Sequence, residues 1–252
     1  MGQMNNNSVI LLTACINPKG MPYTTLQDCD VRMQQYIDAL HFYLENSRAK
    51  IVFIENTAYD LSPYFIDSLD KGSLEVLCFD GNHFDRAKGK GYGEALIIEY
   101  GLSHSCFLKD ADQIIKITGR LKCQNINRLI EKCNDPNTVY AWLTLDESNN
   151  PICDSRVFVA PGSFWESCFL QNKENINDSK HYYFEHLLFD TLKDWKRGKG
   201  RFKEIWFPMT IEGVGGSTGE VYSKSDSYSL RFYLHYLLHK CGYYAPIKFW
   251  IK

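Results

Sequence analysis

Continuous apolar runs and amphipathic segments alternate along the first half of the chain. Apolar runs bounded by polar or turn-forming residues predict four buried strands, at residues 9–16, 50–54, 74–79 and 113–118. Apolar residues spaced three or four apart predict helices at 30–46 and 94–102. Strands that alternate with helices are typical of a mostly parallel sheet with right-handed crossovers. The first half therefore predicts an α/β fold with helices flanking the sheet.

The second half of the chain alternates less regularly. Its apolar pattern predicts strands at residues 139–145 and 154–159, and a helix at 180–195. A basic stretch at 196–203 and a glycine-rich stretch at 211–219 are typical of loops. A chain of 252 residues is long enough to form one large α/β domain.

Composition narrows the class of protein. Hydrophobic residues make up 44% of the sequence and charged residues 23%, as in ordinary soluble proteins. A net charge of -2 gives no general attraction to nucleic acid, so no nucleic-acid partner is expected. The nine cysteines are spread without a CxxC pair, which is typical of free thiols in a reducing cytosol. The first residues lack the pattern of a secretory signal, so we expect a cytoplasmic location.

The carboxyl-terminal segment, residues 229–252, is a candidate for membrane contact. Its spacing predicts a helix, and the mixture of lysine with aromatic residues at its end is typical of interfacial contacts. Two interpretations stay open: peripheral attachment at the inner membrane face, or a helix and tail packed on the sheet. The basic stretch at 196–203 can likewise meet a lipid headgroup or lipid diphosphate, or stay solvated.

The end of the fourth predicted strand is the main candidate for a ligand site. Ligands of α/β proteins bind at the carboxyl ends of strands. Lys116, Arg120 and Lys122 place three positive charges there, next to Thr118 and Gly119. A cationic, glycine-flanked strand end is able to receive a diphosphate, which predicts a nucleotide-sugar site. The alternative is that these cations only solvate the strand end.

Other polar residues extend this candidate site. Glu55 and Asn56 follow the second strand, where they can hydrogen-bond a base or ribose, or cap the next turn. Arg32 stands near a helix start, where the helix dipole does not favour a cation, and this hints at an anionic partner. Lys88 and Gly89 open a turn that can contact phosphate. Its GKGYGE sequence does not match the dinucleotide fingerprint, and no P-loop motif occurs, which argues against a Rossmann dehydrogenase or P-loop kinase.

Asp110 and Asp112 form an Asp-x-Asp pair. Pairs of this kind hold a divalent cation against a diphosphate in many sugar-transferring enzymes, where they lie at the end of a strand. Here the pair precedes a strand, so we expect it on the far side of the sheet from the ligand. The cationic strand end then takes the place of the metal, and we expect an enzyme without a cofactor. A divalent metal held by Asp110 and Asp112 stays open as the less favoured alternative.

Most of the chain resembles a known family. The resemblance rests on the segments TACINP, IVFIENT, KGKGYGEALIIEY, IIKITGRL, DSRVFVAP, YYFEHLLFDTL and PMTIEGVGGSTG. They look like bacterial glycosyltransferases that assemble capsular polysaccharide or lipopolysaccharide O-antigen chains, with the nucleotide-diphospho-sugar transferase fold called GT-A. The resemblance implies a donor-binding half at residues 1–135 and an acceptor-binding half at 136–252, with a closing glycine-rich loop and a C-terminal helix. The sequence departs from the family in lacking an Asp-x-Asp pair at the strand end.

The resemblance also implies roles for particular residues. An inverting sugar transfer needs a base for the acceptor hydroxyl, and the candidates, in order, are Glu185, Asp154 and His186. Asp154 and Arg156 point to one face, either to contact the acceptor or only to form a surface ion pair. The donor-binding candidates are Thr13, Arg32, Glu55, Asn56, Lys88, Gly89, Gly91, Glu94, Lys116, Thr118, Gly119, Arg120, Gly215, Gly216 and Ser217.

The sequence thus predicts a glycosyltransferase that moves a sugar from a nucleotide-sugar donor to a growing surface polysaccharide or lipid-linked glycan. Two other functions stay open: a sugar nucleotidyltransferase, and a non-catalytic glycan-binding or assembly subunit. The first predicts a glycine-rich signature directly after the first strand, where this chain has CINPKG. The second predicts that the purified protein releases no nucleotide from a donor.

Overall fold

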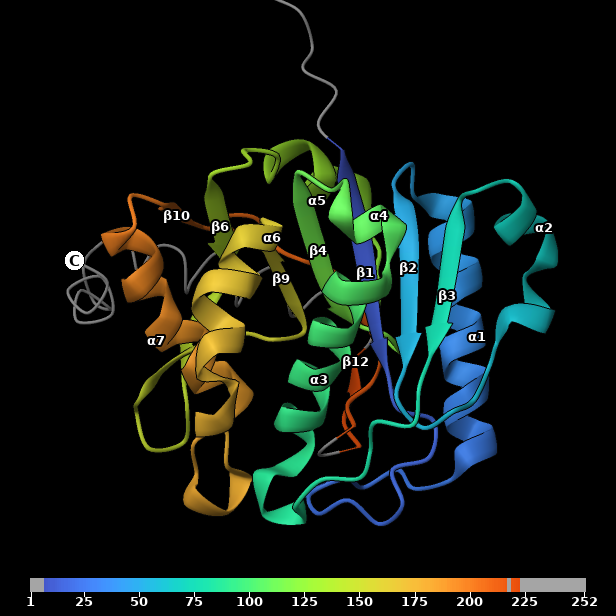
Figure 1. Cartoon of the computed structure of the whole chain (residues 1–252), viewed down its shortest axis with the longest axis horizontal. Helices are drawn as coiled ribbons and strands as arrows, with labels where there is room; N and C mark the ends of the chain where they lie inside the picture. The colour runs from blue at the N-terminus through green and yellow to red at the C-terminus, as the bar shows by residue number, and fades with distance from the viewer. Residues whose placement is uncertain (1–6, 217–218, 223–252) are drawn as a thin grey trace, which may run out of the picture.

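A seven-stranded sheet forms the centre of the protein (Figure 1). The computed structural model describes residues 7–216 and 219–222. In spatial order the strands are β10 (Arg201–Glu204), β6 (Thr138–Ala141), β9 (Val157–Ala160), β4 (Gln113–Thr118), β1 (Ser8–Ala14), β2 (Lys50–Glu55) and β3 (Leu74–Cys78). Of these seven, β9 runs antiparallel to its neighbours, and the other pairs are parallel. The prediction of a mostly parallel sheet is confirmed.

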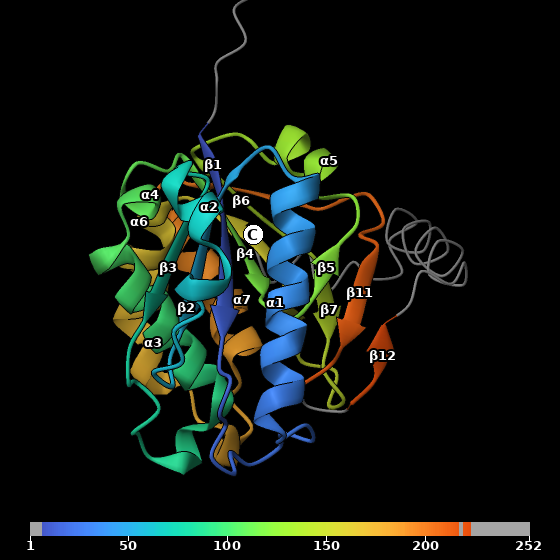
Figure 2. The same cartoon turned by 90° about the vertical axis from the view of Figure 1, so that its right-hand side faces the viewer.

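Helices cover both faces of the sheet, as Figures 1 and 2 show together. One face carries α1 (Cys29–Asn46) and α5 (Ile126–Lys132). The other carries α3 (Gly89–His104), α4 (Cys106–Lys109), α6 (Gly162–Phe164) and α7 (Phe184–Arg197). The shorter helical segments are α2 (Ile66–Asp70), a π-helical turn at Trp165–Phe169, and 3-10 turns at Ser62–Tyr64, Arg86–Lys88, Leu170–Asn175 and Asp178–Lys180. The prediction of flanking helices is therefore confirmed as well.

Strand side chains alternate between two apolar cores, one under each helical layer. In β1, Val9 and Leu11 pack in the core with α3 and α7, whereas Ile10 and Leu12 pack in the core with α1. Successive side chains of a strand point to opposite faces, so a strand covered on both faces is apolar at nearly every position. This is the physical reason for the continuous apolar runs in the sequence.

Two smaller sheets complete the described part of the chain. One contains β5 (Lys122–Cys123), β11 (Ile211–Val214) and β12 (Val221–Tyr222), with β11 antiparallel to both of the others. The other is a hairpin of β7 (Leu143–Leu145) and β8 (Pro151–Cys153). The three-stranded sheet brings a late segment of the chain back to the end of β4, because β5 follows β4 by only a few residues.

The helix predicted at 94–102 is longer than expected. It begins at Gly89, so the predicted glycine-rich turn is in fact its first turns. Asp178, far away in the sequence, accepts a hydrogen bond from the backbone N–H of Lys90 in the first turn. This distant carboxylate satisfies an N–H that a helix start leaves open, and it has no signal in the local sequence.

Several boundaries in the second half also differ. The strand predicted at 139–145 divides at Trp142, whose carbonyl accepts a hydrogen bond from the N–H of Asp154. The strand predicted at 154–159 begins only at Val157, and the helix predicted at 180–195 begins at Phe184. Residues 154–156 are thus a turn that leads into β9.

Two stretches predicted as loops are partly strands. Residues 201–204 of the basic stretch pair with β6 as β10, and residues 211–214 of the glycine-rich stretch pair with β5 as β11. Neither partner is near in sequence, so the pairing is a tertiary effect. Both predicted halves contribute strands to the one central sheet. Residues 229–252 lie outside the described part, and within that part no helix is long and apolar enough to cross a membrane.

Candidate functional site

The polar candidates gather at one edge of the central sheet. The carboxyl ends of β1, β2, β3 and β4 point to the lower edge in Figure 1, and the first turns of α3 and α7 lie at the same edge. The turn before β9 joins them, because the N–H of Thr118 donates to the carbonyl of Arg156. Parallel strands always bring their carboxyl ends together, so the sheet collects residues from distant parts of the chain at this edge.

A buried hydrogen-bonded network links β1, α3, β4 and α7. The Lys116 ammonium is fully buried, at 2.5 Å from the Glu94 carboxylate and 2.5 Å from the carbonyl oxygen of Ser155. The Thr13 hydroxyl donates to the same Glu94 oxygen at 2.7 Å, and the Ser155 hydroxyl donates to Glu185 at 2.5 Å. Four predicted site residues thus belong to one network. Because the charge of Lys116 is matched by Glu94 inside the protein, we do not propose it as a phosphate ligand.

Arg120 lies just past the end of β4 and is almost entirely buried. Its Nη1 donates to the neutral side chain of Gln35 in α1 at 3.1 Å, and its guanidinium lies 5.9 Å from the ring of Tyr36. Among the groups that the structure describes, the Arg120 Nε has no hydrogen-bond partner. Gly216 packs so closely that a Cβ there would stand 2.3 Å from Nη2. The predicted donor residues Arg120 and Gly216 are therefore brought together.

Two loops meet over Arg120. The N–H of Thr25, in the loop after β1, donates to the carbonyl of Gly216 at 3.1 Å. Gly215 donates to the carbonyl of Glu220 at 2.8 Å, which closes the turn between β11 and β12. Ser217 lies outside the described residues. A phosphate beside Arg120 would therefore lie close to Gly216, in a turn that has little side-chain bulk.

Arg32 does not face an open site. It is buried, and it donates to the carbonyl oxygens of Cys15 and Leu26. The anionic partner that its position suggested is absent among the described residues; backbone carbonyls take that place. Arg32 therefore fixes the loop between β1 and α1, and we propose no direct donor contact for it.

The carboxyl end of β1 nevertheless lies in a positive field. Burial raises the pKa of the Cys15 thiol to about 11, while the charges of Arg32, Arg120 and Arg86 act on the same pKa in the opposite direction. The negative charge of Glu55 raises the pKa of Cys15 further. Three guanidinium groups and one carboxylate therefore surround the end of β1, an environment that favours a bound anion.

Glu55 and Asn56, both buried at the end of β2, play different parts. The Glu55 carboxylate accepts hydrogen bonds from the N–H groups of Ile16, Thr57 and Tyr59. Burial raises the pKa of Glu55 above its ordinary value, although these hydrogen bonds act in the opposite direction. Of the two predicted roles of Glu55, the structure therefore favours capping of the following loops over a hydrogen bond to a base or ribose. Asn56 is only 2% exposed and its Oδ1 has no partner in the described structure, so it is free to accept a hydrogen bond from a ligand.

The first turn of α3 is held against the turn before α7. Gly89 has a φ of 78°, and a Cβ there would stand 1.9 Å from the Asp178 carboxylate, so only glycine fits. Burial raises the pKa of Asp178 to about 6; the positive charge of Lys90 lowers it and the negative charge of Glu185 raises it further. Sequence reasoning missed Asp178, because a lone Asp in a polar loop carries no signal. Lys88 forms an ion pair with Glu174 at 3.1 Å.

The three candidate bases lie in distinct surroundings. Glu185 is in the first turn of α7, half-buried, with one oxygen accepting from Ser155. Asp154 is buried and its carboxylate binds Arg156 in a two-pronged ion pair. The Nδ1 of His186 accepts the N–H of Tyr183, which leaves Nε2 to donate to Asp146 at 3.0 Å.

These contacts rank the candidates. The ring of His186 caps α7 and anchors the β7–β8 turn, so both of its nitrogens are committed. Burial of Asp146 raises its pKa, but hydrogen bonds from Asn150 and His186 outweigh this and bring it to about 2. Asp154 is committed to Arg156. Glu185 is the candidate whose position and second carboxylate oxygen fit a base for an incoming hydroxyl.

The remaining candidates have structural surroundings. Gly119 donates its N–H to the carbonyl of Thr13 at 3.0 Å, and Gly91 packs against the side chain of Phe184. Asp110 and Asp112 lie between α4 and the amino end of β4, at the opposite edge from Arg120. The pair thus lies in the loop that leads into β4, as the sequence predicts, and its position relative to the donor stays a prediction.

The fold has distant likenesses among solved structures. The glycosyltransferase GlyE of Streptococcus pneumoniae TIGR4 matches with a TM-score of 0.49 and 13% identity, over 79% of this chain and 45% of that chain. The mannosyltransferase Ktr4p of S. cerevisiae matches with a TM-score of 0.49 and 8% identity, over 88% and 75%. A 4-diphosphocytidyl-2C-methyl-D-erythritol synthase matches with a TM-score of 0.43 and 11% identity, over 93% and 99%. The chain thus spans less than half of the GlyE chain. Likenesses this distant assign no activity.

No protein-family profile matches the sequence, and no curated protein matches it. The functional argument therefore rests on this chain's own residues.

Proposed function

We propose that the protein is a transferase that moves a sugar from a nucleotide-sugar donor to a glycan or lipid-linked acceptor. The observation that carries the proposal is the cationic end of β1 and β4. Arg32, Arg86 and Arg120 act there on Cys15, and Arg120 has a buried Nε with no described partner. A buried guanidinium with one N–H group that lacks a described acceptor is a suitable ligand for a diphosphate. The resemblance to capsule and O-antigen transferases supports the same class of donor.

The donor would lie across the strand ends. Its diphosphate would contact Arg120 and the turn at Gly215 and Gly216. Its base would lie toward Asn56, whose unpartnered Oδ1 can accept one hydrogen bond from a base or ribose. No metal is needed for this placement, because the guanidinium supplies the positive charge that a cation would supply elsewhere.

Glu185 would act as the base. In an inverting transfer the acceptor hydroxyl attacks the anomeric carbon, its proton passes to a carboxylate, and the nucleoside diphosphate leaves. The Ser155 hydroxyl holds one Glu185 oxygen at 2.5 Å, which leaves the other for the acceptor. The leaving diphosphate would stay on Arg120, which stabilises the charge that develops on it.

A thermal-shift screen with nucleotides and nucleotide sugars tests the donor site. A ligand that binds only the native state raises the unfolding midpoint. We expect a shift with at least one nucleoside diphosphate sugar and with the matching diphosphate, and a smaller shift with the monophosphate. No shift with any of them would contradict the proposal.

Nucleotide release distinguishes the competing functions. Slow hydrolysis of the bound donor, seen as free nucleoside diphosphate, is expected of a sugar transferase. Binding without release would instead favour a glycan-binding or assembly subunit. Formation of a nucleotide sugar from a nucleoside triphosphate and a sugar phosphate, with release of inorganic diphosphate, would favour a nucleotidyltransferase.

A further inference from the structure

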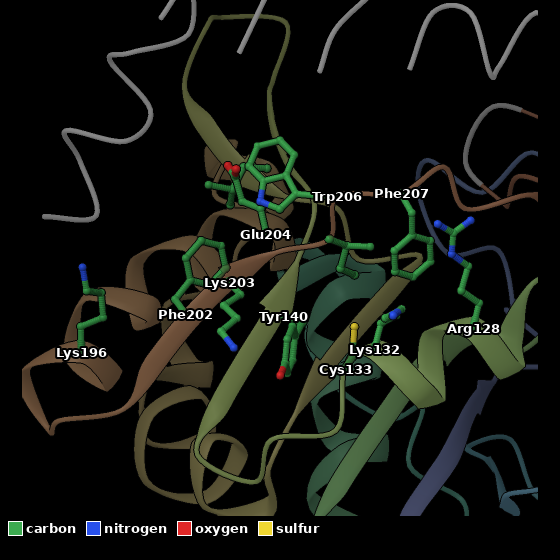
Figure 3. A pocket seen from close by; sticks show the side chains of 12 residues that line it. Arg128, Lys132, Cys133, Tyr140, Lys196, Phe202, Lys203, Glu204, Trp206 and Phe207 are labelled. Carbon is green, nitrogen blue, oxygen red and sulfur yellow. The ribbon is translucent and has the colours of Figure 1, made fainter. Parts of the chain in front are cut away.

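A cavity of about 680 Å³ lies away from the candidate donor site, between β10, β6 and the end of α5 (Figure 3). The strands β10 and β4 are separated by β6 and β9. At ~4.8 Å between neighbouring strands, β10 is roughly 14 Å from β4. The cavity therefore belongs to a different part of the sheet from Arg120, which lies just past the end of β4.

The floor of the cavity is apolar. Tyr140, Ile205, Phe207 and Cys133 line it and are all buried. Trp206, at the rim, is 38% exposed. A floor of this composition suits a hydrocarbon chain, whereas a free sugar would need many hydrogen-bond partners.

Its mouth is cationic. Arg128, Lys132, Lys196 and Lys203 line the cavity and are exposed, and Glu204 is the carboxylate of the lining. The whole sequence carries a net charge of -2, so this concentration of positive charge is local.

Two of these cations lie over aromatic rings of the floor. The Arg128 guanidinium lies 4.9 Å from the ring of Phe207, and the Lys203 ammonium lies 5.9 Å from the ring of Tyr140. The charged ends of both side chains therefore lie close to aromatic rings of the lining. The basic stretch at 196–203 contributes a lysine at each of its ends to the lining of this cavity.

We propose that this cavity binds a lipid phosphate, with the first carbons of its chain on the aromatic floor and its phosphate or diphosphate among the cations. An apolar floor below a cationic mouth is complementary to such an amphiphile at both ends. The site does not depend on sugar transfer, and it would hold a lipid phosphate whether or not the protein is a transferase.

Calorimetry with farnesyl phosphate, kept below its micelle concentration, tests the site. We expect binding of farnesyl phosphate, and much weaker binding of farnesol or inorganic phosphate alone, because each supplies only half of the contacts. Binding should weaken as the salt concentration rises.

A matched pair of variants locates the site. One lysine near an anionic lipid contributes on the order of fivefold in affinity, so Lys132→Gln with Lys203→Gln should weaken binding about 25-fold. The control combines Lys109→Gln, also in the last turn of a helix, with Lys71→Gln, also exposed. The control should bind like the parent protein, and unfolding midpoints show that both variants fold.

Four outcomes of the binding measurements alone would overturn the inference, and a competition result described below is a fifth. The four are no binding of farnesyl phosphate, equal binding of farnesol, equal binding of inorganic phosphate, and an unchanged affinity in the Lys132/Lys203 variant. A nucleoside diphosphate that displaces farnesyl phosphate, together with loss of farnesyl phosphate binding in Arg120→Ala, would place the lipid at the strand ends. This result would also overturn the inference. Failure here leaves the donor site untouched, because the two sites share no residue named above.

Discussion

Replacing Lys116 with methionine tests the buried network behind the candidate base. The change removes the cation and leaves the Glu94 carboxylate without its ion-pair partner in a largely buried position. Breaking a buried pair by removing one partner costs about 3–5 kcal/mol. The Glu94 side chain is 19% exposed and keeps its hydrogen bond from Thr13, so we expect the lower end of this range, about 3 kcal/mol.

Urea unfolding followed by tryptophan fluorescence measures this loss, from the midpoint and slope of the transition. The control is the double variant Lys116→Met with Glu94→Gln, in which no buried charge is left alone. Glutamine can still accept from Thr13, so the double variant should recover about 2 kcal/mol of the loss. A single variant that loses less than about 1 kcal/mol, or a double variant no more stable than the single one, would refute the reasoning.

Three further predictions concern the site and its pH dependence. Arg120→Ala should weaken binding of a nucleoside diphosphate sugar at least tenfold by calorimetry, since a charge-assisted contact contributes about 1.5–3 kcal/mol. The control Lys71→Ala should leave the affinity for the donor unchanged. Equal donor affinities of Arg120→Ala and the parent protein would remove Arg120 from the donor site. EDTA should leave donor binding and turnover intact, whereas complete loss restored by a divalent cation would return Asp110 and Asp112 to consideration. Asp178 has a folded pKa of about 6, above its ordinary value of 3.8, so the native state holds the extra proton and stability should fall as the pH rises from about 4 to 6. Asp178→Asn should remove this fall and stabilise the protein at pH 7 by up to about 3 kcal/mol, as measured by urea unfolding, and the reasoning fails if the two pH profiles are parallel.

Local sequence was sufficient for strands covered on both faces and for an amphipathic helix that packs on the sheet through one face. The strand predicted at 113–118 has those limits in the structure, and the helix predicted at 30–46 differs by one residue at its start. Short strands that pair with distant partners were harder. β10 and β11 come from stretches that resemble loops, and only their pairing with β6 and β5 makes them strands.

The candidate site was likewise predictable from the sequence in part. Polar residues after apolar strands were identifiable, because the edge where parallel strands end is known from the pattern alone. The contacts that these residues make could not be identified from the sequence. Glu55 accepts hydrogen bonds from backbone N–H groups, Lys116 pairs with Glu94, and Arg32 donates hydrogen bonds to carbonyls. Each of these side chains is of a type that could instead bind a ligand.

The sequence by itself determined that this is an α/β protein with a mostly parallel sheet, because burial on both faces requires apolar residues at nearly every strand position. It also placed Arg120 and Asn56 at the carboxyl edge of the sheet. The tertiary structure decided which charges remain available there, because the partners of several buried groups, such as Glu94 for Lys116, come from segments far away in the chain. The Asp178 cap on α3, the Lys116–Glu94 pair and the cationic cavity beside β10 all depend on such contacts, which local patterns do not record.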